Sequence, residues 1–202
     1  MSNGLFQSNT WLISDNGLCA VIDCGSPVED ILREAECLKS KIVLIVLTHG
    51  HVDHVYSIEG LKAKTGAKIY MHEDEKQLYM DSTLNGYMQF GMNRSETFPL
   101  HDFLVKDHDS IMLGKLELKV LHTPGHTSGG ICILCEGHLF TGDTLFNRSI
   151  GRYDMPTGNG KTLISSIREK LYTLPDETIV HPGHGEDSSI SEERKHNPYV
   201  SG

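Results

Sequence analysis

Three histidines and one aspartate occur within the segment THGHVDH, which covers residues 48–54. His49 and His51 are two positions apart, so their side chains point the same way if the segment is extended. Asp53 and His54 follow where the chain turns towards a helix, so they can face a second point nearby. Neutral imidazole and carboxylate groups are ligands suited to Zn²⁺ or Fe²⁺. Because four potential ligands diverge within one segment, the segment indicates two metal ions rather than one.

Three further segments carry potential ligands, and each follows an apparent strand. They are HTPGHT at 122–127, TGDT at 141–144 and HPGH at 181–184. Since strand ends meet at one edge of a sheet, we expect the four segments to converge in space. A lone histidine is more often structural, and seven others are expected not to bind metal: His72, His101, His108, His122, His138, His181 and His196.

Apolar patterns around these segments predict alternating strands and helices. The run IVLIVL at 42–47 is typical of a strand buried on both faces, and it leads directly into THGHVDH. Strands flank the turn signal at residues 15–17, a helix ends at Gly66, and an amphipathic helix covers 161–174. We therefore expect one α/β domain over residues 1–202. Residues 73–113 lack a clear period, which is compatible with a lid or with an ordinary covering loop.

Charge and composition exclude several classes of protein. The net charge is −9 and basic residues do not cluster, so no nucleic-acid partner is expected. No apolar run approaches the roughly 20 residues of a membrane span, and MSNGLFQSNT does not resemble a signal peptide. Five cysteines indicate reduced thiols, and Cys132 and Cys135 are expected on opposite faces of one buried strand. These features predict a cytoplasmic protein.

The segment THGHVDH matches the H-x-H-x-D-H motif of the metallo-β-lactamase superfamily. VIDCG, TPGHT, FTGDTLF and PGHGE also resemble motifs of this family and occur in the same order along nearly the whole chain. The resemblance implies an αβ/βα four-layer sandwich, in which two mixed β-sheets pack face to face and are flanked by helices. It also implies two divalent metal ions at one edge, with zinc as the expected metal and iron or manganese as alternatives.

The resemblance also implies a role for individual residues. Asp53 and Asp143 would be the catalytic carboxylates, and Asp23 in VIDCG matches a family aspartate that supports the ligands. Asp23 could instead be a simple turn residue at a strand end. The implied ligands are His49, His51 and His126 for the first metal, Asp53, His54 and His184 for the second, and Asp143 for both.

The leaving group separates the possible hydrolytic reactions. A metal-bridging water would be a hydroxide at neutral pH and could attack a carbonyl carbon. A thiol has a pKa of about 8.5 and can leave as a thiolate, whereas an amine needs a proton. The segments LHTPGHTSGG and TGDTLFNRSIGR most resemble glyoxalase II-like hydrolases, which cleave acyl-glutathione thioesters. We therefore predict hydrolysis of a small thioester, with the acyl group, the thiol carrier and the oligomeric state left open.

The chain departs from the glyoxalase II pattern where that family binds glutathione. It ends 18 residues after His184, so we expect the C-terminal helical domain of that family to be absent. Two family tyrosines are replaced by Asp154 and Glu186. Arg152 matches a basic residue of the family and could bind a substrate carboxylate through its planar fork, or form a surface ion pair. Tyr153 is a second candidate of the same kind.

Two alternatives to a hydrolase remain open from the sequence. SIGRYD and EDSSISEERKHNPY also resemble persulfide dioxygenases, which use one iron on two histidines and an aspartate and leave the second site empty. A metal-binding protein without turnover is the other alternative. A β-lactamase is not expected without a secretion signal, and a nuclease is not expected from the acidic balance and the missing RNA-binding insertion. The number and identity of the bound metals would separate these functions.

Overall fold

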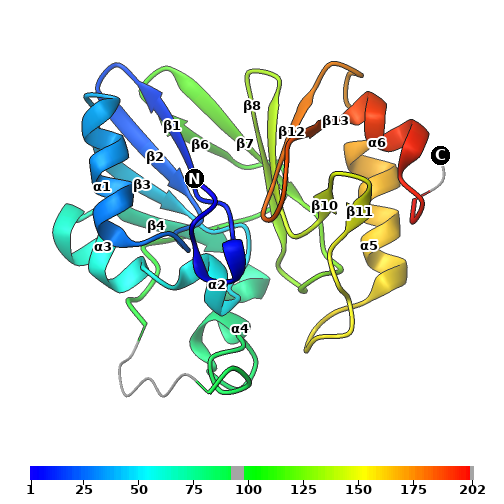
Figure 1. Ribbon diagram of the computed structural model, residues 1–202, viewed down its shortest axis with the longest axis horizontal. Coiled ribbons are helices and arrows are strands. Elements are labelled where there is room, and N and C mark those ends of the chain that lie inside the picture. The colour runs from blue at the N-terminus through cyan, green and yellow to red at the C-terminus, as the bar shows by residue number, and fades with distance from the viewer. Residues whose placement is uncertain (92–97, 201–202) are drawn as a thin grey trace.

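The computed structural model describes residues 1–91 and 98–200, and two β-sheets form its centre (Figure 1). The first sheet contains β1 (Trp11–Asp15), β2 (Leu18–Ile22), β3 (Lys41–Val46), β4 (Lys68–His72) and β5 (Phe103–Val105) in that order. The second has the order β13 (Ser188–Ser189), β12 (Ile179–Pro182), β9 (His138–Gly142), β8 (Ile131–Cys135), β7 (Leu116–His122) and β6 (Ser110–Leu113). Each sheet contains parallel and antiparallel pairs, so both are mixed. A separate hairpin joins β10 (Leu145–Phe146) to β11 (Ser149–Ile150).

Helices cover the outer faces of both sheets (Figure 1). The first sheet is covered by α1 (Val28–Cys37) and α3 (Ile58–Thr65), and the second by α5 (Gly160–Ser166), its π-helical continuation η3 (Ile167–Leu171) and α6 (Ile190–His196). Shorter turns are η1 (Leu5–Gln7), α2 (Val52–Val55), η2 (Glu73–Glu75) and α4 (Lys76–Met80). This arrangement confirms the predicted αβ/βα sandwich. In the described residues, no helix is long and apolar enough to cross a membrane.

Three apolar layers hold the sandwich together, and the alternation of side chains along each strand explains them. In β2, Cys19 and Val21 face the helices, whereas Ala20 and Ile22 face the other sheet. In β8, Cys132 packs towards the outer helices and Cys135 packs between the sheets, as predicted. Each sheet therefore buries both of its faces.

Local signals in the sequence account for several turns. Asn16 and Gly17 both have positive φ angles, 49° and 80°, which suit the two-residue hairpin between β1 and β2. Gly66 ends α3 in the left-handed conformation, as predicted. In α5 and η3, Leu163, Ile167 and Leu171 are fully buried on the predicted apolar face.

The stretch 73–113 is more regular than the sequence suggested. It contains η2, α4, β5 and β6, and Leu78 and Tyr79 of α4 are buried. The weak periodicity therefore did not reveal these short elements, which pack against partners elsewhere in the chain. Residues 92–97 of this stretch lie outside the described residues.

Candidate metal centre

The four ligand-bearing segments meet at one edge of the sandwich. THGHVDH follows β3 and enters α2, His126 lies in the loop between β7 and β8, Asp143 directly follows β9, and His184 follows β12. Close backbone approach makes this convergence possible. A Cβ atom added at Gly183 would collide with Oδ1 of Asp143 and crowd the ring of His54. A glycine is therefore required where the β12 loop passes the site.

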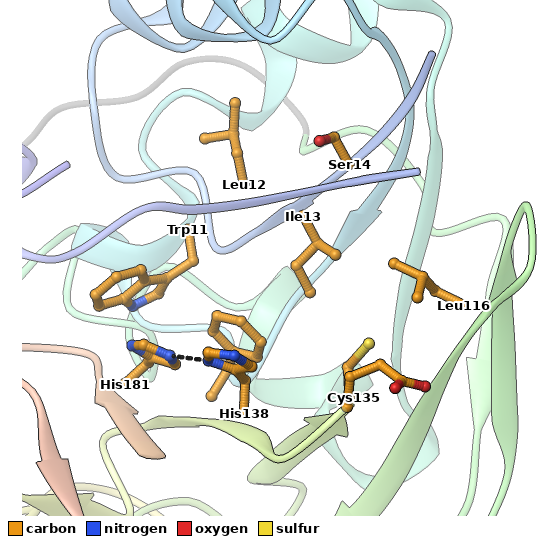
Figure 2. Close-up of a pocket in the computed structure, with 10 residues that line it drawn as sticks. Trp11, Leu12, Ile13, Ser14, Leu116, Cys135, His138 and His181 are labelled. Atoms are coloured by element: carbon orange, nitrogen blue, oxygen red, sulfur yellow. Dashed lines mark hydrogen bonds between the residues drawn. The ribbon is translucent and has the colours of Figure 1, made fainter. Parts of the chain in front are cut away.

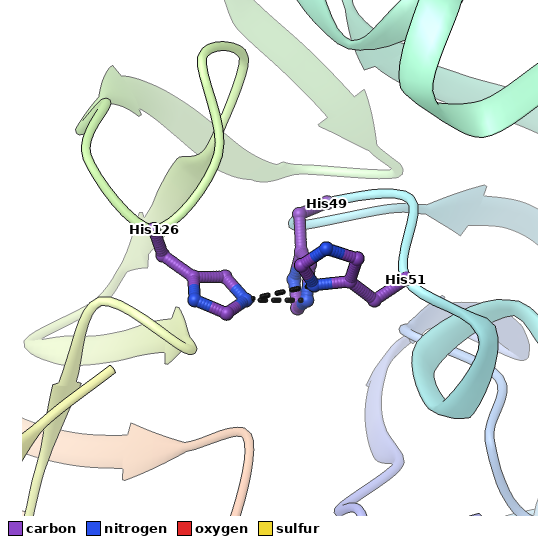
Figure 3. Close-up of side chains that lie close together, drawn as sticks. All are labelled: His49, His51 and His126. Carbon is purple, nitrogen blue, oxygen red and sulfur yellow. Dashed lines mark hydrogen bonds between the residues drawn. The ribbon is translucent and has the colours of Figure 1, made fainter. Parts of the chain in front are cut away.

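Three of the histidines form the first cluster (Figure 3). Nε2 of His126 lies 2.9 Å from Nδ1 of His51 and 3.2 Å from Nε2 of His49. A tetrahedral zinc ion bound by nitrogen at about 2.0–2.1 Å would separate its ligand atoms by about 3.3 Å. The three nitrogen atoms are therefore spaced closely enough to share one ion.

Asp53, His54 and His184 form a second cluster beside the first. Nε2 of His184 lies 3.1 Å from Oδ2 of Asp53 and 3.3 Å from Nε2 of His54. Asp53 and His54 belong to α2, whereas His184 comes from the other sheet. This donor set of two imidazoles and one carboxylate suits a second divalent ion.

Asp143 lies between the two clusters. Its Oδ1 is 3.2 Å from Nε2 of His54 and 3.7 Å from Nε2 of His184, and its Oδ2 is 3.7 Å from Nε2 of His126. Among the described residues, the buried Oδ1 of Asp143 has no hydrogen bond of good geometry. A buried carboxylate oxygen without a donor is costly unless a cation accompanies it. The donor set and this oxygen therefore fit two cations that share Asp143.

The protonation states of the histidines differ between the clusters. Burial, with further contributions from neighbouring imidazoles, lowers the pKa of His49 well below its usual range, and burial lowers the pKa of His51 to about 3. Burial also opposes protonation of His54, but Asp53, Asp143 and Asp23 together raise its pKa well above the usual range. The first cluster is thus neutral and ready to bind a metal. In the second, three carboxylates stabilise a proton on His54, and a divalent cation that replaced this proton would balance the same negative charge.

Hydrogen bonds to the ring nitrogens that point away from the site fix which nitrogen of each histidine faces it. Asp23 accepts a hydrogen bond from Nδ1 of His54 at 2.8 Å and one from the hydroxyl of Thr48 at 2.7 Å. Nδ1 of His49 lies 3.1 Å from that hydroxyl, so Asp23 orients His49 through Thr48. The carbonyl of Arg152 accepts a hydrogen bond from Nδ1 of His126 at 2.7 Å. Asp23 also directly follows β2, so the strand-end position and the contact with His54 occur in the same residue.

Replacing Asp23 by asparagine should weaken metal binding about 10–100-fold, because the support of two histidines is disturbed. The amide group would donate towards Nδ1 of His54, which would move the ring proton to Nε2 and block its lone pair. Titration of the metal-free protein with Zn²⁺ against a competing chelator measures this change. Asp30→Asn on α1 is the control. An unchanged affinity in Asp23→Asn would show that the carboxylate does not select the tautomer.

A cavity of about 250 Å³ opens beside both clusters. Its lining includes Asp53, Asp143 and His184 of the clusters, together with Phe6, Phe90, Met155 and Arg152. The rings of Phe6 and Phe90 touch, with centroids 4.6 Å apart. Sequence reasoning missed both phenylalanines, since neither belongs to a motif and they come from segments far apart in the chain.

The two candidate substrate residues are placed differently. Arg152 is among the residues that line the cavity, and its guanidinium group forms two hydrogen bonds of 2.8 and 2.9 Å to Asp154. Both side chains are more than half exposed, so this ion pair is weak and can open for a ligand. Tyr153 is 50% exposed, packs near Gly160, and is not among the described residues that line the cavity.

Histidines that were not expected to bind metal lie outside the two clusters. Nε2 of His181 lies 2.9 Å from Nδ1 of His138, and the His181 ring contacts Trp11 and Phe140 in a separate pocket between the sheets (Figure 2). The rings of His72 and His122 stack 3.9 Å apart and are tilted by only 13°. Asp74 is close to this pair. A metal ion bound by an imidazole nitrogen lies near the plane of that ring, and two parallel stacked rings share no such position, so these residues do not suit a metal site.

The chain belongs to the metallo-β-lactamase superfamily, whose family model matches residues 3–184. It is 35% identical over 199 residues to the hydroxyacylglutathione hydrolase GloC of Haemophilus influenzae, covering 97% of this chain and 94% of GloC. The crystal structure of the BLEG-1 B3 metallo-β-lactamase superposes with a TM-score of 0.91 at 30% identity, covering 100% of this chain and 98% of BLEG-1. The crystal structure of TTHA1623 in a di-iron-bound form superposes with a TM-score of 0.88 at 30% identity, covering 99% of this chain and 98% of TTHA1623. These similarities confirm the family predicted from the motifs and support a metal-dependent hydrolase.

Proposed function

We propose that this protein hydrolyses a small thioester, such as an acyl-glutathione, at a centre of two divalent metal ions. His49, His51 and His126 would hold one ion, Asp53, His54 and His184 the other, and Asp143 both. The observation that carries the proposal is the convergence of the other six side chains around Asp143. Zinc is the proposed metal, and iron remains an alternative because TTHA1623 binds two iron ions.

When bound, two such ions supply an activated water and a Lewis acid for the carbonyl oxygen of the substrate. The protein must then orient the water and accept its proton. Asp53 and Asp143 are the two carboxylates among the proposed ligands, and both line the cavity. Burial opposes the ionisation of Asp143, but His54 and neighbouring histidines lower its pKa well below the usual range. Both carboxylates are proposed as the catalytic groups.

The lining of the cavity favours a thiolate leaving group. Among the described residues, it contains neither a lysine nor a tyrosine that could donate a proton to a departing amine. A thiolate needs no such donor, because the pKa of a thiol is only about 8.5. The GloC relative is itself named as a hydroxyacylglutathione hydrolase, which supports a thioester substrate. Arg152 is the proposed partner of a substrate carboxylate, while Tyr153 could only act from outside the cavity.

A panel of substrates tests the proposal. We expect the purified protein to release thiol from S-lactoylglutathione or a related small thioester, and to act faster on thioesters that carry a carboxylate. A β-lactam such as nitrocefin serves as the substrate with an amine leaving group and should turn over much more slowly. No thiol release across the panel would refute the proposal. Oxygen uptake on glutathione persulfide in the same preparation would instead identify a dioxygenase.

A further inference from the structure

Glu75, at the end of η2, carries a carboxylate that is almost fully buried, with 1% of the residue exposed. Its Oε1 accepts a hydrogen bond of 2.8 Å from the backbone amide of Gly50. Its Oε2 accepts two more, one of 2.8 Å from the hydroxyl of Thr127 and one of 3.0 Å from the amide of Gly129. All three donors come from distant parts of the chain.

These donors belong to two of the segments that carry the histidines. Gly50 lies between His49 and His51, and Thr127 directly follows His126. One carboxylate therefore joins the segment after β3 to the loop between β7 and β8. The distance between these two segments determines whether the three imidazoles can meet at one point.

His51 depends on this support more than the other histidines do. The distal nitrogens of His54 and His126 have hydrogen-bond partners, whereas Nε2 of His51 is buried with none among the described residues. The position of the His51 ring must then be set by its backbone. At Gly50, a Cβ atom would lie 2.9 Å from Cα of Tyr79, so the backbone is already packed tightly against α4.

Burying the Glu75 carboxylate has a measurable cost. Burial raises its pKa to about 7, although the donors from Gly50, Thr127 and Gly129 oppose the shift. A glutamine would fill the same space without a charge. However, its NH₂ group would face a backbone N–H at Gly50 or at Gly129, and one of the hydrogen bonds would be lost. The three donors therefore require a hydrogen-bond acceptor at each of the two side-chain oxygen positions, which only a carboxylate supplies.

We propose that Glu75 is a positioning residue, which holds the segments of His51 and His126 at the spacing that the three-histidine metal site requires. The inference rests on the proposed function only through the assignment of His49, His51 and His126 as ligands. It requires no particular substrate.

Titration of the metal-free protein with Co²⁺ tests this role, because the visible absorption of bound cobalt reports its ligand geometry. In Glu75→Gln we expect one of the two ions to bind 10–100-fold more weakly, with an altered absorption spectrum, as found when outer contacts of metal ligands are removed. Glu73→Gln is the matched control, since Glu73 is the exposed glutamate two positions earlier and pairs with Lys106. It should bind both ions as the wild type does.

A pair of substitutions at Thr127 provides an independent comparison. Thr127→Val removes one of the three hydrogen bonds and should weaken the same ion roughly 2–10-fold. Thr127→Ser keeps the hydroxyl and should restore wild-type binding. If Glu75→Gln does not fold, this pair decides the question.

The inference is overturned if folded Glu75→Gln, or Thr127→Val in its place, binds both cobalt ions with wild-type affinity and spectrum. A wild-type protein that binds no cobalt at the three histidines would refute the ligand assignment and this inference together. Tight binding of two ions without turnover of any thioester would refute the proposed substrate alone and leave the role of Glu75 standing.

Discussion

Replacing Asp143 by alanine should remove both metal ions and abolish hydrolysis. Asp143 is the only proposed ligand that faces both clusters, with Oδ1 3.2 Å from Nε2 of His54 and Oδ2 3.7 Å from Nε2 of His126. Without it, each ion would keep three protein ligands but lose the anion that balances the charge between them. Each lost ion would remove several kcal/mol of transition-state stabilisation, so activity should decrease at least about 10³-fold.

Metal content and turnover should be measured on the same preparation of Asp143→Ala. Elemental analysis after dialysis gives the ions retained per chain, and thermal melting in the presence of a chelator shows whether the metal-free fold is intact. Asp30→Ala, on the first turn of α1, is the control and should keep both ions. Two tightly bound ions per chain in Asp143→Ala would contradict its assignment as the bridging ligand.

Replacing His184 by alanine should remove one ion and lower thioester hydrolysis on the order of 10³-fold. His184 contacts Asp53 and His54, whereas the cluster of His49, His51 and His126 does not involve it. Its side chain is 28% exposed, so its removal should leave the fold intact. One ion should remain, and turnover should fall because the proposed reaction needs both.

The same variant separates the two enzymatic functions that the sequence left open. A dioxygenase with one iron on two histidines and an aspartate would leave the second site empty, so it would not depend on His184. Its oxygen uptake should therefore persist. Thioester hydrolysis that is equally unaffected would rule out a reaction that depends on the second ion.

The fold and the proposed ligands were predictable because their signals are local. The continuous apolar run of β3 predicts a buried strand, and Asn16-Gly17 predicts a hairpin without knowledge of the rest of the chain. THGHVDH likewise places His49 and His51 two positions apart at the end of that strand. The structure places these side chains together with His126 and His184, as the motifs implied.

Features that depend on distant partners were not predictable. Glu75 lies in a stretch without periodicity, and its donors are 25 and more than 50 residues away in the chain. Phe6 lines the cavity and adopts a left-handed backbone conformation with φ of 54°, which the sequence does not indicate because residue 6 is neither glycine nor asparagine. The four residues of β6 form a strand only by pairing with β7. Such contacts become visible only after the segments have been placed in space.

Anomalous diffraction from crystals of protein expressed without added metal tests the metal centre most directly. We expect two peaks about 3.5–4 Å apart, one among His49, His51 and His126 and the other beside His184, with Asp143 between them. Absorption edges would identify each metal. A map with no anomalous peak among these side chains, from active protein, would contradict the central claim.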